Sequence, residues 1–325
     1  MIKVLNLLSS EKDDFNILYN RVVDVIESYP YDQYKLYPAK SRSGWEALFL
    51  HRLRISFSNE QHFIFYDDSL LKPVFIIYHI NNWDETHFGI KMAKTVITFS
   101  FGDCNELSIS KFVQECEDVL RKYGVKFVSS RINGDNLLLV NGHLGQGYSF
   151  YETIIWPVAK IDNSISIDMP CKLATNEDSL VRIKAIANNH QYQRGHFHCD
   201  TNIDNEIVNL MYSKWVETSY YSDDFICVIE DNNEIAGYFV CGIDDLLKEF
   251  LGYEYGRLKS LALDSSFRGK GLGINLFKGT LQFLKTKECE YIDSGYATKN
   301  HTSAFLHSSN SFYSVYEEVT LHKWI

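Results

Sequence analysis

The chain has 325 residues, 45% of them apolar and 23% charged, so its composition is that of a globular protein and excludes a disordered or collagen-like chain. Its length exceeds the ~100–200 residues of a typical domain, which predicts two packed units. Thirty-two basic residues against 42 acidic ones give a net charge of −10, which argues against binding to nucleic acids or to anionic membranes.

The N-terminal residues and the cysteines predict a cytoplasmic protein. Polar and acidic residues follow the segment Met1 to Leu8, which is too short for a signal peptide. No apolar run approaches the ~18 residues that a membrane span requires. The seven cysteines are scattered and contain no CxxC pair, as expected of reduced thiols.

In chain order, residues 1–44 predict a helical extension around residues 15–26, and a first lobe follows at 45–165. Apolar periodicity identifies the elements of this lobe. They are strands at 63–66, 73–78 and 93–99, a helix at 109–123, and strands at 125–128 and 148–158.

The polar stretch 160–175 predicts a boundary, and residues 170–325 repeat the same order of elements roughly 160 residues further along. The elements of the second lobe are strands at 225–230, 235–240 and 257–263, a helix with apolar positions between 272 and 284, and strands at 291–294 and within 312–324. We therefore expect an α/β protein of two lobes, each a mixed central sheet flanked by helices.

A glycine-rich turn joins a strand to a helix between Leu261 and Ile274. Three glycines within five residues let the backbone approach a ligand and direct several N–H groups at it. Arg268 and Lys270 add positive charge to this turn. The chemistry suits a diphosphate, whereas the GxGxG spacing fits neither a P-loop nor a GxGxxG dinucleotide fingerprint. The alternative is a turn that only connects the two elements.

The pattern Arg268-x-x-Gly271-x-Gly273 after an apolar strand resembles motif A of the GNAT superfamily of N-acetyltransferases. The resemblance implies a GNAT-like α+β fold and acetyl-CoA as cosubstrate, without a metal. It also implies that loop amides hold the pyrophosphate. The residues concerned are Arg268, Gly269, Lys270, Gly271, Leu272, Gly273 and Ile274.

The same resemblance assigns the pantetheine arm to the preceding strand. Leu261, Ala262 and Leu263 would bind this arm, and the backbone amide of Leu261 would polarise the thioester carbonyl. Nothing between Phe99 and Lys111 resembles the Arg-x-x-Gly-x-Gly loop. We therefore expect 45–165 to be a degenerate, non-catalytic GNAT-like lobe and 170–325 to be the catalytic domain.

Two further segments resemble the dTDP-fucosamine acetyltransferases and related dTDP-4-amino-4,6-dideoxysugar N-acetyltransferases. Residues 83–89 are similar to their W-D/E-x-x-F-F-G signature, except that His87 replaces an aromatic residue. Residues 195–200, followed by Tyr212 and Trp215, are similar to their S-R-F-x-x-D stretch and Y-x-x-W pair. The resemblance implies acetyl transfer to a dTDP-linked amino sugar for surface polysaccharide.

Catalytic and acceptor residues follow from the same resemblance. In the family the general acid is a tyrosine seven residues after an asparagine, and counting seven from Asn300 reaches His307. A histidine can donate a proton near neutral pH, so His307 is either the acid or, with Asn300, a CoA contact. Tyr313 is the next candidate for the acid. The acceptor-binding candidates are His198, Asp200, Tyr212 and Trp215.

Several alternatives remain open at this stage. His196 and His198 would share one face of a strand, next to Cys199 and Asp200, and could ligate a metal. Asp200 could instead cap a helix at 203–215, whose aromatic residues would then belong to the core. The acceptor could be a peptide, a polyamine or another small amine, or the chain could be a CoA-binding scaffold without turnover. A homodimer is left open.

Overall fold

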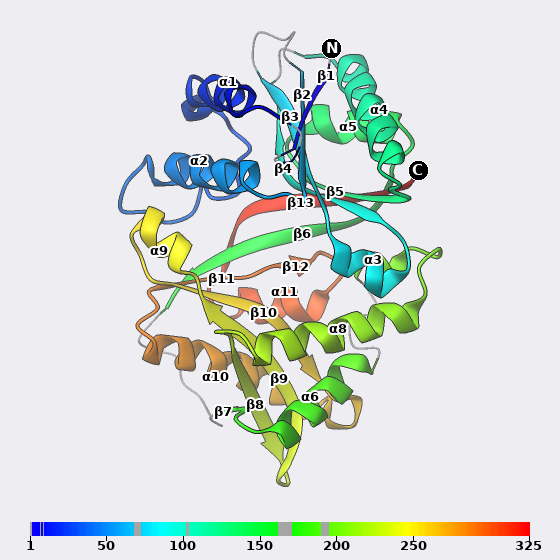
Figure 1. Ribbon diagram of the computed structural model, residues 1–325. Coiled ribbons are helices and arrows are strands. Elements are labelled where there is room, and N and C mark those ends of the chain that lie inside the picture. Colours follow the sequence, from blue (N-terminus) through cyan, green and yellow to red (C-terminus); the bar gives the residue numbers. More distant parts are fainter. Residues whose placement is uncertain are drawn as a thin grey trace. The chain divides into compact units, whose positions relative to one another are not determined.

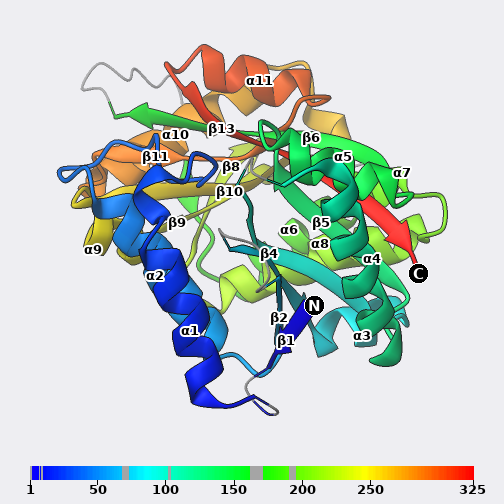
Figure 2. The same ribbon diagram turned by 90° about the horizontal axis from the view of Figure 1, so that it is seen from above.

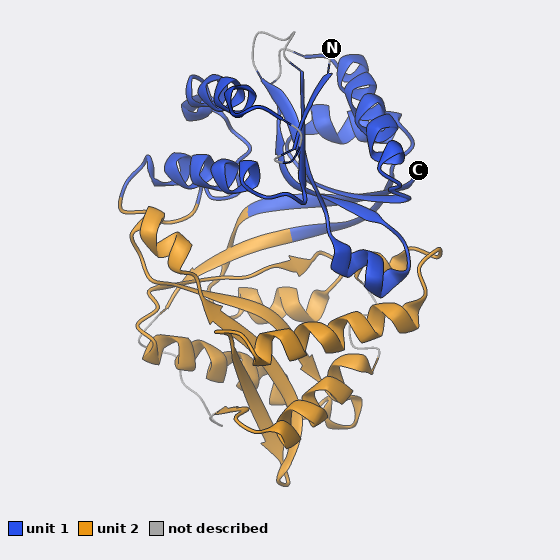
Figure 3. Ribbon diagram, viewed as in Figure 1, with its two compact units in different colours: residues 1–36, 41–154, 316–325 blue, residues 37–40, 155–315 orange. Residues whose placement is uncertain are grey.

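The structure is a computed structural model that describes residues 2–6, 8, 10–67, 73–101, 104–161, 171–189 and 195–325. The chain divides into two compact units, coloured separately in Figure 3. Unit 1 comprises residues 1–36, 41–154 and 316–325, and unit 2 comprises residues 37–40 and 155–315. The centre of the expected boundary at 160–175 lies outside the described residues.

Unit 1 is built on a mixed sheet with the strand order β1-β2-β3-β4-β5-β13 (Figure 1). Neighbouring strands are antiparallel, except that β4 and β5 are parallel. The strands are β1 Ile2–Leu5, β2 His62–Asp67, β3 Val74–Ile80, β4 Met92–Phe99, β5 Phe127–Asn133 and β13 Tyr313–Trp324.

Helices cover both faces of this sheet (Figure 2). They are α1 Lys12–Val23, η1 Ile26–Ser28, α2 Gly44–Phe57, α3 Asn82–Phe88, α4 Glu106–Lys122 and α5 Leu137–Gly145. On one face, the predicted apolar stripe of α4 packs through Val113 and Leu120 against Val128 and Leu321. On the other face, the ring of Phe99 stacks on Tyr29 at 4.0 Å between centroids. Because both faces are covered, the central strand β3 is buried at consecutive positions instead of alternating ones.

Unit 2 repeats this architecture with the strand order β7-β8-β9-β10-β11-β6, in which only β10 and β11 are parallel. The strands are β6 Ser149–Lys160, β7 Lys172–Leu173, β8 Phe225–Asp231, β9 Glu234–Ile243, β10 Tyr255–Leu263 and β11 Tyr291–Asp293, with β12 Tyr296–Ala297 beside β6. The helices are α6 Glu177–Asn188, α7 His196–Cys199, α8 Asn205–Tyr220, α9 Asp245–Leu251, η2 Ser265–Phe267, α10 Leu272–Thr286 and α11 His301–Ser308.

Helices also cover both faces of the sheet in unit 2. On one face, Leu276 and Phe277 of α10 belong to a buried cluster with Leu258. On the opposite face, Ile183 of α6 and Val216 of α8 belong to a second cluster. The shared strand order and the helices on both faces confirm the predicted repeat of one mixed α/β fold.

The last strand of each sheet differs from the expectation. The repeat predicted that 148–158 closes the first copy and that 312–324 closes the second. In the structure, residues 158–160 of β6 pair with β11 of unit 2, and residues 318–324 of β13 pair with β5 of unit 1. Each half of the chain therefore supplies the closing strand of the other sheet, which sequence similarity between the halves does not reveal.

Residues 1–44 also differ from a separate helical extension. Helix α1 is present, but β1 pairs with β2, and Tyr29 stacks on Phe99. Residues 1–36 therefore belong to unit 1, and 37–40 belong to unit 2. None of the helices in the described part of the chain is long and apolar enough to span a bilayer.

The exchanged strand predicts that a change near the C-terminus destabilises unit 1. Leu321 is 0% exposed, lies in β13 and contacts the core of unit 1. We expect Leu321→Ala to lower the free energy of unfolding of unit 1 by about 2–5 kcal/mol, because truncation leaves a cavity. Urea unfolding followed by hydrogen exchange resolved by unit measures this change.

Val181→Ala is the control, because Val181 lies on α6 of unit 2 and is 67% exposed. Its effect should stay within about 0.5 kcal/mol. If Leu321→Ala destabilised unit 1 no more than this control destabilises unit 2, β13 would not be part of the core of unit 1.

Candidate functional site

A gap opens between β10 and β11 in unit 2. The two strands pair at only three positions, from Tyr255 opposite Tyr291 to Arg257 opposite Asp293, whereas β10 continues to Leu263. Beyond Arg257, no described strand pairs with this edge of β10. A bulge between Leu258 and Ser260 also bends β10 against β9.

The backbone of β10 directs two amides into this gap. The Asp264 amide donates to the Ala236 carbonyl of β9 at 2.9 Å. N–H direction alternates along a strand, so the amides of Leu261 and Leu263 point away from β9, to the open edge. The Leu261 amide therefore faces the gap, and its role toward the thioester stays a prediction. Ala262, expected in the same site, points its backbone groups at β9 instead.

The glycine loop follows β10 and leaves open space beside two of its glycines. Gly269 and Gly271 have φ of +80° and +78°, and a Cβ atom added at either would meet no atom within 4 Å. Only glycine adopts this backbone without strain. Gly273 lies in closer packing, because a Cβ there would be 3.2 Å from Leu263 Cδ1 and the Leu263 side chain would have to shift slightly.

The N-terminus of α10 follows the loop and lacks a side-chain cap. Its N-cap is Gly271, and its first turn contains no acidic residue. In unit 1 the corresponding helix α4 is capped by Asn105, whose Oδ1 accepts from the Ser108 amide at 2.8 Å, and Glu106 lies in its first turn. Free N–H groups and the helix dipole favour an anion at an uncapped N-terminus. Of these two equivalent helices, only α10 suits a phosphate.

Both cations of the loop have intramolecular partners. Lys270 Nζ lies 2.7 Å from Asp231 Oδ2 and 5.0 Å from the ring centroid of Phe267. Arg268 Nη2 lies 3.5 Å from the Leu263 carbonyl oxygen. The side chain of Lys270 is half exposed, so a phosphate can compete with Asp231 for it.

Asp264 fixes the shape of the loop. Its carboxylate accepts hydrogen bonds from the hydroxyl and the amide of Ser266, at 2.6 and 2.9 Å, and from Arg182 at 2.9 Å. The bonds from Ser266, followed by the ion pair with Arg182, lower the pKa of Asp264 below its ordinary value. These bonds hold the turn at η2, where the loop begins.

The equivalent gap in unit 1 is filled by side chains of the chain itself. Strands β4 and β5 also pair at three positions, the last being Lys94 opposite Ser129. Beyond it, the Thr95 hydroxyl accepts from the Arg131 amide at 2.7 Å and donates to the Arg131 carbonyl at 3.2 Å.

Thr98 follows the last paired residue of its strand by four positions, as Leu261 does (94 to 98, 257 to 261). The Tyr29 hydroxyl donates to the Thr98 carbonyl at 2.9 Å. In unit 1 the carbonyl at the position that corresponds to Leu261 is therefore already hydrogen-bonded.

The structure does not support His307 as a general acid. His307 is 4% exposed, and its Nδ1 lies 2.7 Å from the Ser303 carbonyl oxygen, which requires the proton on Nδ1. Burial lowers the pKa of His307 to about 4. Its Nε2 is buried and has no hydrogen-bond partner in the described part of the chain. A neutral imidazole in this tautomer has no proton on Nε2 to donate. Asn300 caps α11 by accepting from the Ser303 amide at 3.1 Å.

Unit 1 contains the same arrangement around His143. His143 is buried, its Nδ1 lies 2.8 Å from the Leu139 carbonyl oxygen, and burial lowers its pKa to about 4. Its ring meets Tyr148 edge-on at 4.8 Å, as the ring of His307 meets Phe312 at 4.9 Å. Because unit 1 lacks the glycine loop, we interpret this histidine as a packing residue in both units. The repeated spacing Asn-x6-His-x4-Tyr/Phe is the sequence signal that would have indicated this.

Tyr313, the second candidate acid, lies at the closed end of the gap. Burial raises the pKa of Tyr313, and Tyr291 adds to the shift. Tyr313 in turn contributes, after burial, to the raised pKa of Tyr255. These neighbours are the first residues of β11 and β10 and lie opposite each other, six residues before Leu261 along β10. Tyr296, which the sequence analysis missed, stacks on His307 at 4.8 Å.

Three of the four acceptor candidates lie together on α7 and α8. His198 Nε2 lies 3.0 Å from Asn209 Oδ1, and its ring lies parallel to that of Tyr212 at 5.7 Å. Tyr212 meets Trp215 edge-on at 5.3 Å, and Trp215 is 45% exposed. Trp215 therefore presents an aromatic surface to solvent rather than filling the core.

Asp200 is buried, and its Oδ1 accepts from the amide and the side chain of Asn202, at 3.1 and 3.0 Å. It does not cap the following helix, because Asp204 caps α8 by accepting from the Glu206 amide at 2.9 Å. The strand expected at residues 196–199 is the short helix α7, so His196 and His198 do not share a face. Within the described residues, no three His, Cys, Asp or Glu side chains are arranged to hold a metal.

Residues 83–89 form most of helix α3 and the glycine that ends it, in unit 1. Asp84 is buried and pairs with Lys94 at 2.8 Å, and the ring of Trp83 stacks on His87 at 4.9 Å. The helix ends at Gly89, whose φ is +70°. His87, the departure from the family pattern, supplies the stacking partner of Trp83.

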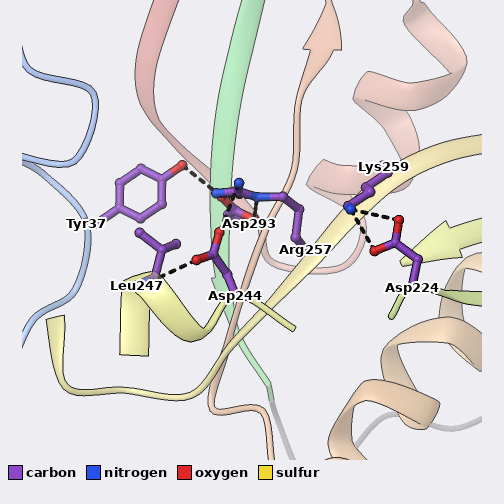
Figure 4. A network of polar contacts seen from close by, with 7 residues as sticks. All are labelled: Tyr37, Asp224, Asp244, Leu247, Arg257, Lys259 and Asp293. Carbon is purple, nitrogen blue, oxygen red and sulfur yellow. Dashed lines mark hydrogen bonds and ion pairs between the residues drawn. The ribbon is translucent and has the colours of Figure 1, made fainter. Parts of the chain in front are cut away.

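The sequence analysis also missed a charged network at the last paired position of β10 and β11 (Figure 4). Arg257 donates to Asp293 and pairs with Asp244, and Tyr37 donates to Asp293 at 3.3 Å. The available signal was an acidic residue at the end of the apolar strand Tyr291–Asp293.

Comparison with known proteins identifies the fold. Residues 188–312 match the sequence model of the acetyltransferase (GNAT) family, and this span contains β10, β11, the glycine loop, α10 and α11. None of the curated protein sequences compared with the chain matches it.

Solved structures resemble the chain over its whole length. A tandem GNAT protein from the clavulanic acid biosynthesis pathway is 10% identical, with a TM-score of 0.57, over 100% of this chain and 98% of that one. A GCN5-related N-acetyltransferase from Sphaerobacter thermophilus is 13% identical, with a TM-score of 0.55, over 89% and 90%. A glucosamine N-acetyltransferase region of a fungal multi-domain β-N-acetylglucosaminidase is 10% identical, with a TM-score of 0.62, over 99% of this chain and 38% of that one. Together they confirm the two-lobe, GNAT-like fold.

The lowered pKa of His307 predicts acid lability. The unfolded chain takes up a proton at this histidine below pH ~6.5, whereas the folded chain does so only near pH 4, so stability falls as the pH drops through this window. Between pH 7 and pH 5 the loss should be about 2 kcal/mol. We expect His307→Gln to remove this part of the pH dependence in urea unfolding at the two pH values.

His143→Gln is the matched variant in unit 1 and should have the same effect on stability. Neither variant should change the shape of the pH profile of kcat between pH 6 and 9. A basic limb that disappears only in His307→Gln would restore the general-acid role.

Proposed function

We propose that the chain is an acyl-CoA-dependent N-acetyltransferase that binds acetyl-CoA in unit 2. The observation that carries the proposal is the uncapped N-terminus of α10, which follows the open glycine loop at the end of β10. The match of residues 188–312 to the GNAT family supports it. The assignment of the catalytic domain to 170–325, with 45–165 non-catalytic, is part of the same proposal.

Acetyl-CoA binding divides between the loop and the strand. The amides of residues 268–274 hold the diphosphate, with Arg268 and Lys270 as charge partners. The backbone groups of Leu261 and Leu263 that face the gap pair with the amides of the pantetheine arm as a neighbouring strand would. This contact takes the place of the hydrogen bonds that β11 no longer provides.

The reaction is direct attack of an amine on the thioester in a ternary complex. The Leu261 amide stabilises the negative charge that develops on the carbonyl oxygen of the tetrahedral intermediate. The amine attacks in its neutral form and passes its proton to water, and the CoA thiolate leaves and takes up a proton from solvent. His307 takes no part in this transfer, because it holds its only proton on Nδ1.

For the acceptor we propose the amino group of a dTDP-4-amino-4,6-dideoxyhexose, whose N-acetylated product would enter surface polysaccharide. The exposed ring of Trp215, next to Tyr212 and His198, suits stacking against a sugar or thymine ring. His198 lies beside the ring of Tyr212, and Asp200, two residues further along the chain, is the second polar candidate. The fungal glucosamine N-acetyltransferase region shows that an amino sugar is an acceptor on this fold in that protein.

We predict one acetyl-CoA per chain, because the gap of unit 1 is filled by Thr95 and Tyr29 and its helix α4 is capped. Calorimetric titration of the full chain measures the stoichiometry. Two equivalent sites per chain would contradict the assignment of unit 1 as non-catalytic.

A substitution in the loop should abolish acetyl-CoA binding. Gly271→Glu places a negative side chain in front of the helix N-terminus, and we expect at least a 100-fold rise in Kd, about 2.7 kcal/mol. Gly147→Glu is the matched control. Gly147 has φ of +82° and the same open space at its Cβ, so both variants carry equal backbone strain. Equal Kd values for the two variants would rule out the loop as the diphosphate site.

Turnover should appear as free CoA thiol released from acetyl-CoA in the presence of an amine. We expect the highest kcat/KM with a dTDP-4-amino-4,6-dideoxyhexose among dTDP-amino sugars, glucosamine, polyamines and peptides. Thiol release with only a peptide or polyamine would keep the acetyltransferase and replace the acceptor. One-site binding without release by any amine would leave a CoA-binding scaffold.

A further inference from the structure

The strands β10 and β11 separate at one defined pair of residues. Arg257 and Asp293 occupy the third and last paired position, after which β11 ends and β10 continues to the glycine loop. Leu261 lies four residues further along β10, roughly 13 Å at the rise of an extended strand. A small change in the direction of β10 at Arg257 therefore becomes a larger displacement at Leu261.

A forked ion pair joins the two strands at this position (Figure 4). Arg257 Nε lies 3.0 Å from Asp293 Oδ1, and Nη2 lies 2.7 Å from Oδ2. The third nitrogen, Nη1, lies 2.9 Å from Asp244 Oδ2. Asp293 is 0% exposed and also accepts from the Tyr37 hydroxyl. A two-point guanidinium–carboxylate contact fixes direction as well as distance.

The third member of the network is itself held in place. The Asp244 carboxylate accepts from the Leu247 amide at 2.9 Å as the N-cap of α9, and the Asp244 amide donates to the Tyr255 carbonyl at 2.9 Å. The guanidinium of Arg257 is therefore anchored to a helix start and to a buried carboxylate at once.

Unit 1 lacks this contact between the strands. At the equivalent position Lys94 lies opposite Ser129, which carries no charge, and Lys94 pairs with Asp84 of α3. Its gap is closed by Thr95, which bonds directly to Arg131. Unit 2, whose gap is open, thus joins the two strands by the ion pair between Arg257 and Asp293, where unit 1 uses the hydrogen bonds of Thr95.

We propose that Arg257 and Asp293 are a positioning pair that fixes where β10 leaves β11, and so holds the Leu261 amide at the thioester carbonyl of acetyl-CoA. The proposal rests on the proposed acetyl transfer. The described contacts of the pair are with Asp244 and Tyr37, and Arg257 precedes Arg268 of the diphosphate loop by eleven residues. We therefore expect the pair to act on the reacting carbonyl and not on the binding of CoA as a whole.

The test is Asp293→Asn in the full-length chain. This substitution keeps the size of the side chain and removes the charge that holds both guanidinium nitrogens. We expect kcat to fall about 10- to 100-fold, because a displacement of about 1 Å at the reacting atoms has that effect. KM for acetyl-CoA should change by less than about threefold. This result distinguishes a positioning role from a loss of binding that affects the ground state and the transition state equally.

Arg257→Lys is the second variant, which keeps the charge and loses the fork, and it should lower kcat in the same direction by a smaller factor. Arg257→Lys replaces Asp293→Asn as the test variant if Asp293→Asn does not fold. Lys94→Gln is the matched control, because it breaks the ion pair at the equivalent position of unit 1. We expect it to lower Tm without changing kcat. An unchanged kcat in Arg257→Lys and Asp293→Asn, or an equal loss in Lys94→Gln, would overturn the proposal.

A second readout separates this proposal from the proposed function. If the wild-type chain releases no thiol with any amine, the transferase assignment fails, but the pair can still be tested by amide hydrogen exchange. Exchange in residues 258–263 should be faster in Asp293→Asn than in the wild type, with residues 95–99 unchanged. Equal exchange in residues 258–263 would overturn the positioning role.

Discussion

The structure depends on how each unit satisfies the backbone groups left unpaired when two parallel strands separate. Buried N–H and C=O groups need partners, and a strand that continues beyond its neighbour leaves a row of them without any. Unit 1 meets this need with its own side chains, because Thr95 bonds to Arg131 and the Tyr29 hydroxyl bonds to Thr98. Unit 2 leaves the edge of β10 open at Leu261 and Leu263. An extended ligand arm with amide groups is the chemical complement of such an edge, and the glycine loop lies where a diphosphate at its end would be.

Comparing the two units separates the demands of the fold from those of the ligand. Asn136 and Asn300 both cap a helix, and His143 and His307 both bond to the carbonyl one turn earlier. Features shared by a unit with the loop and a unit without it belong to packing. At the equivalent positions of unit 1, α4 is capped by Asn105, and Lys94 lies opposite the uncharged Ser129. We therefore assign the uncapped N-terminus of α10 and the ion pair between β10 and β11 to the ligand.

The sequence predicted the elements well because most of them carry a strong apolar period. The stripe of α4 and the hairpin of β8 and β9 are local patterns, and the glycine loop is a local backbone requirement. The exchange of β6 and β13 could not be predicted, because both strands have the alternation that either sheet accepts. The repeat itself suggested the wrong pairing, since it assumes that each copy closes on itself.

The backbone groups of the candidate site could be predicted from the sequence. Gly269, Gly271 and Leu261 were identified because a turn with positive φ and a strand edge leave traces in residue type and order. Side-chain roles were less accessible. The tautomer and the burial of His307 depend on the Ser303 carbonyl and on the rings of three residues distant or separate from α11 in the chain. The fork between Arg257 and Asp293 joins residues 36 positions apart. A family pattern that places a proton donor by counting residues carries no information on which ring nitrogen holds the proton. In this chain the hydrogen bond to the Ser303 carbonyl places that proton on Nδ1.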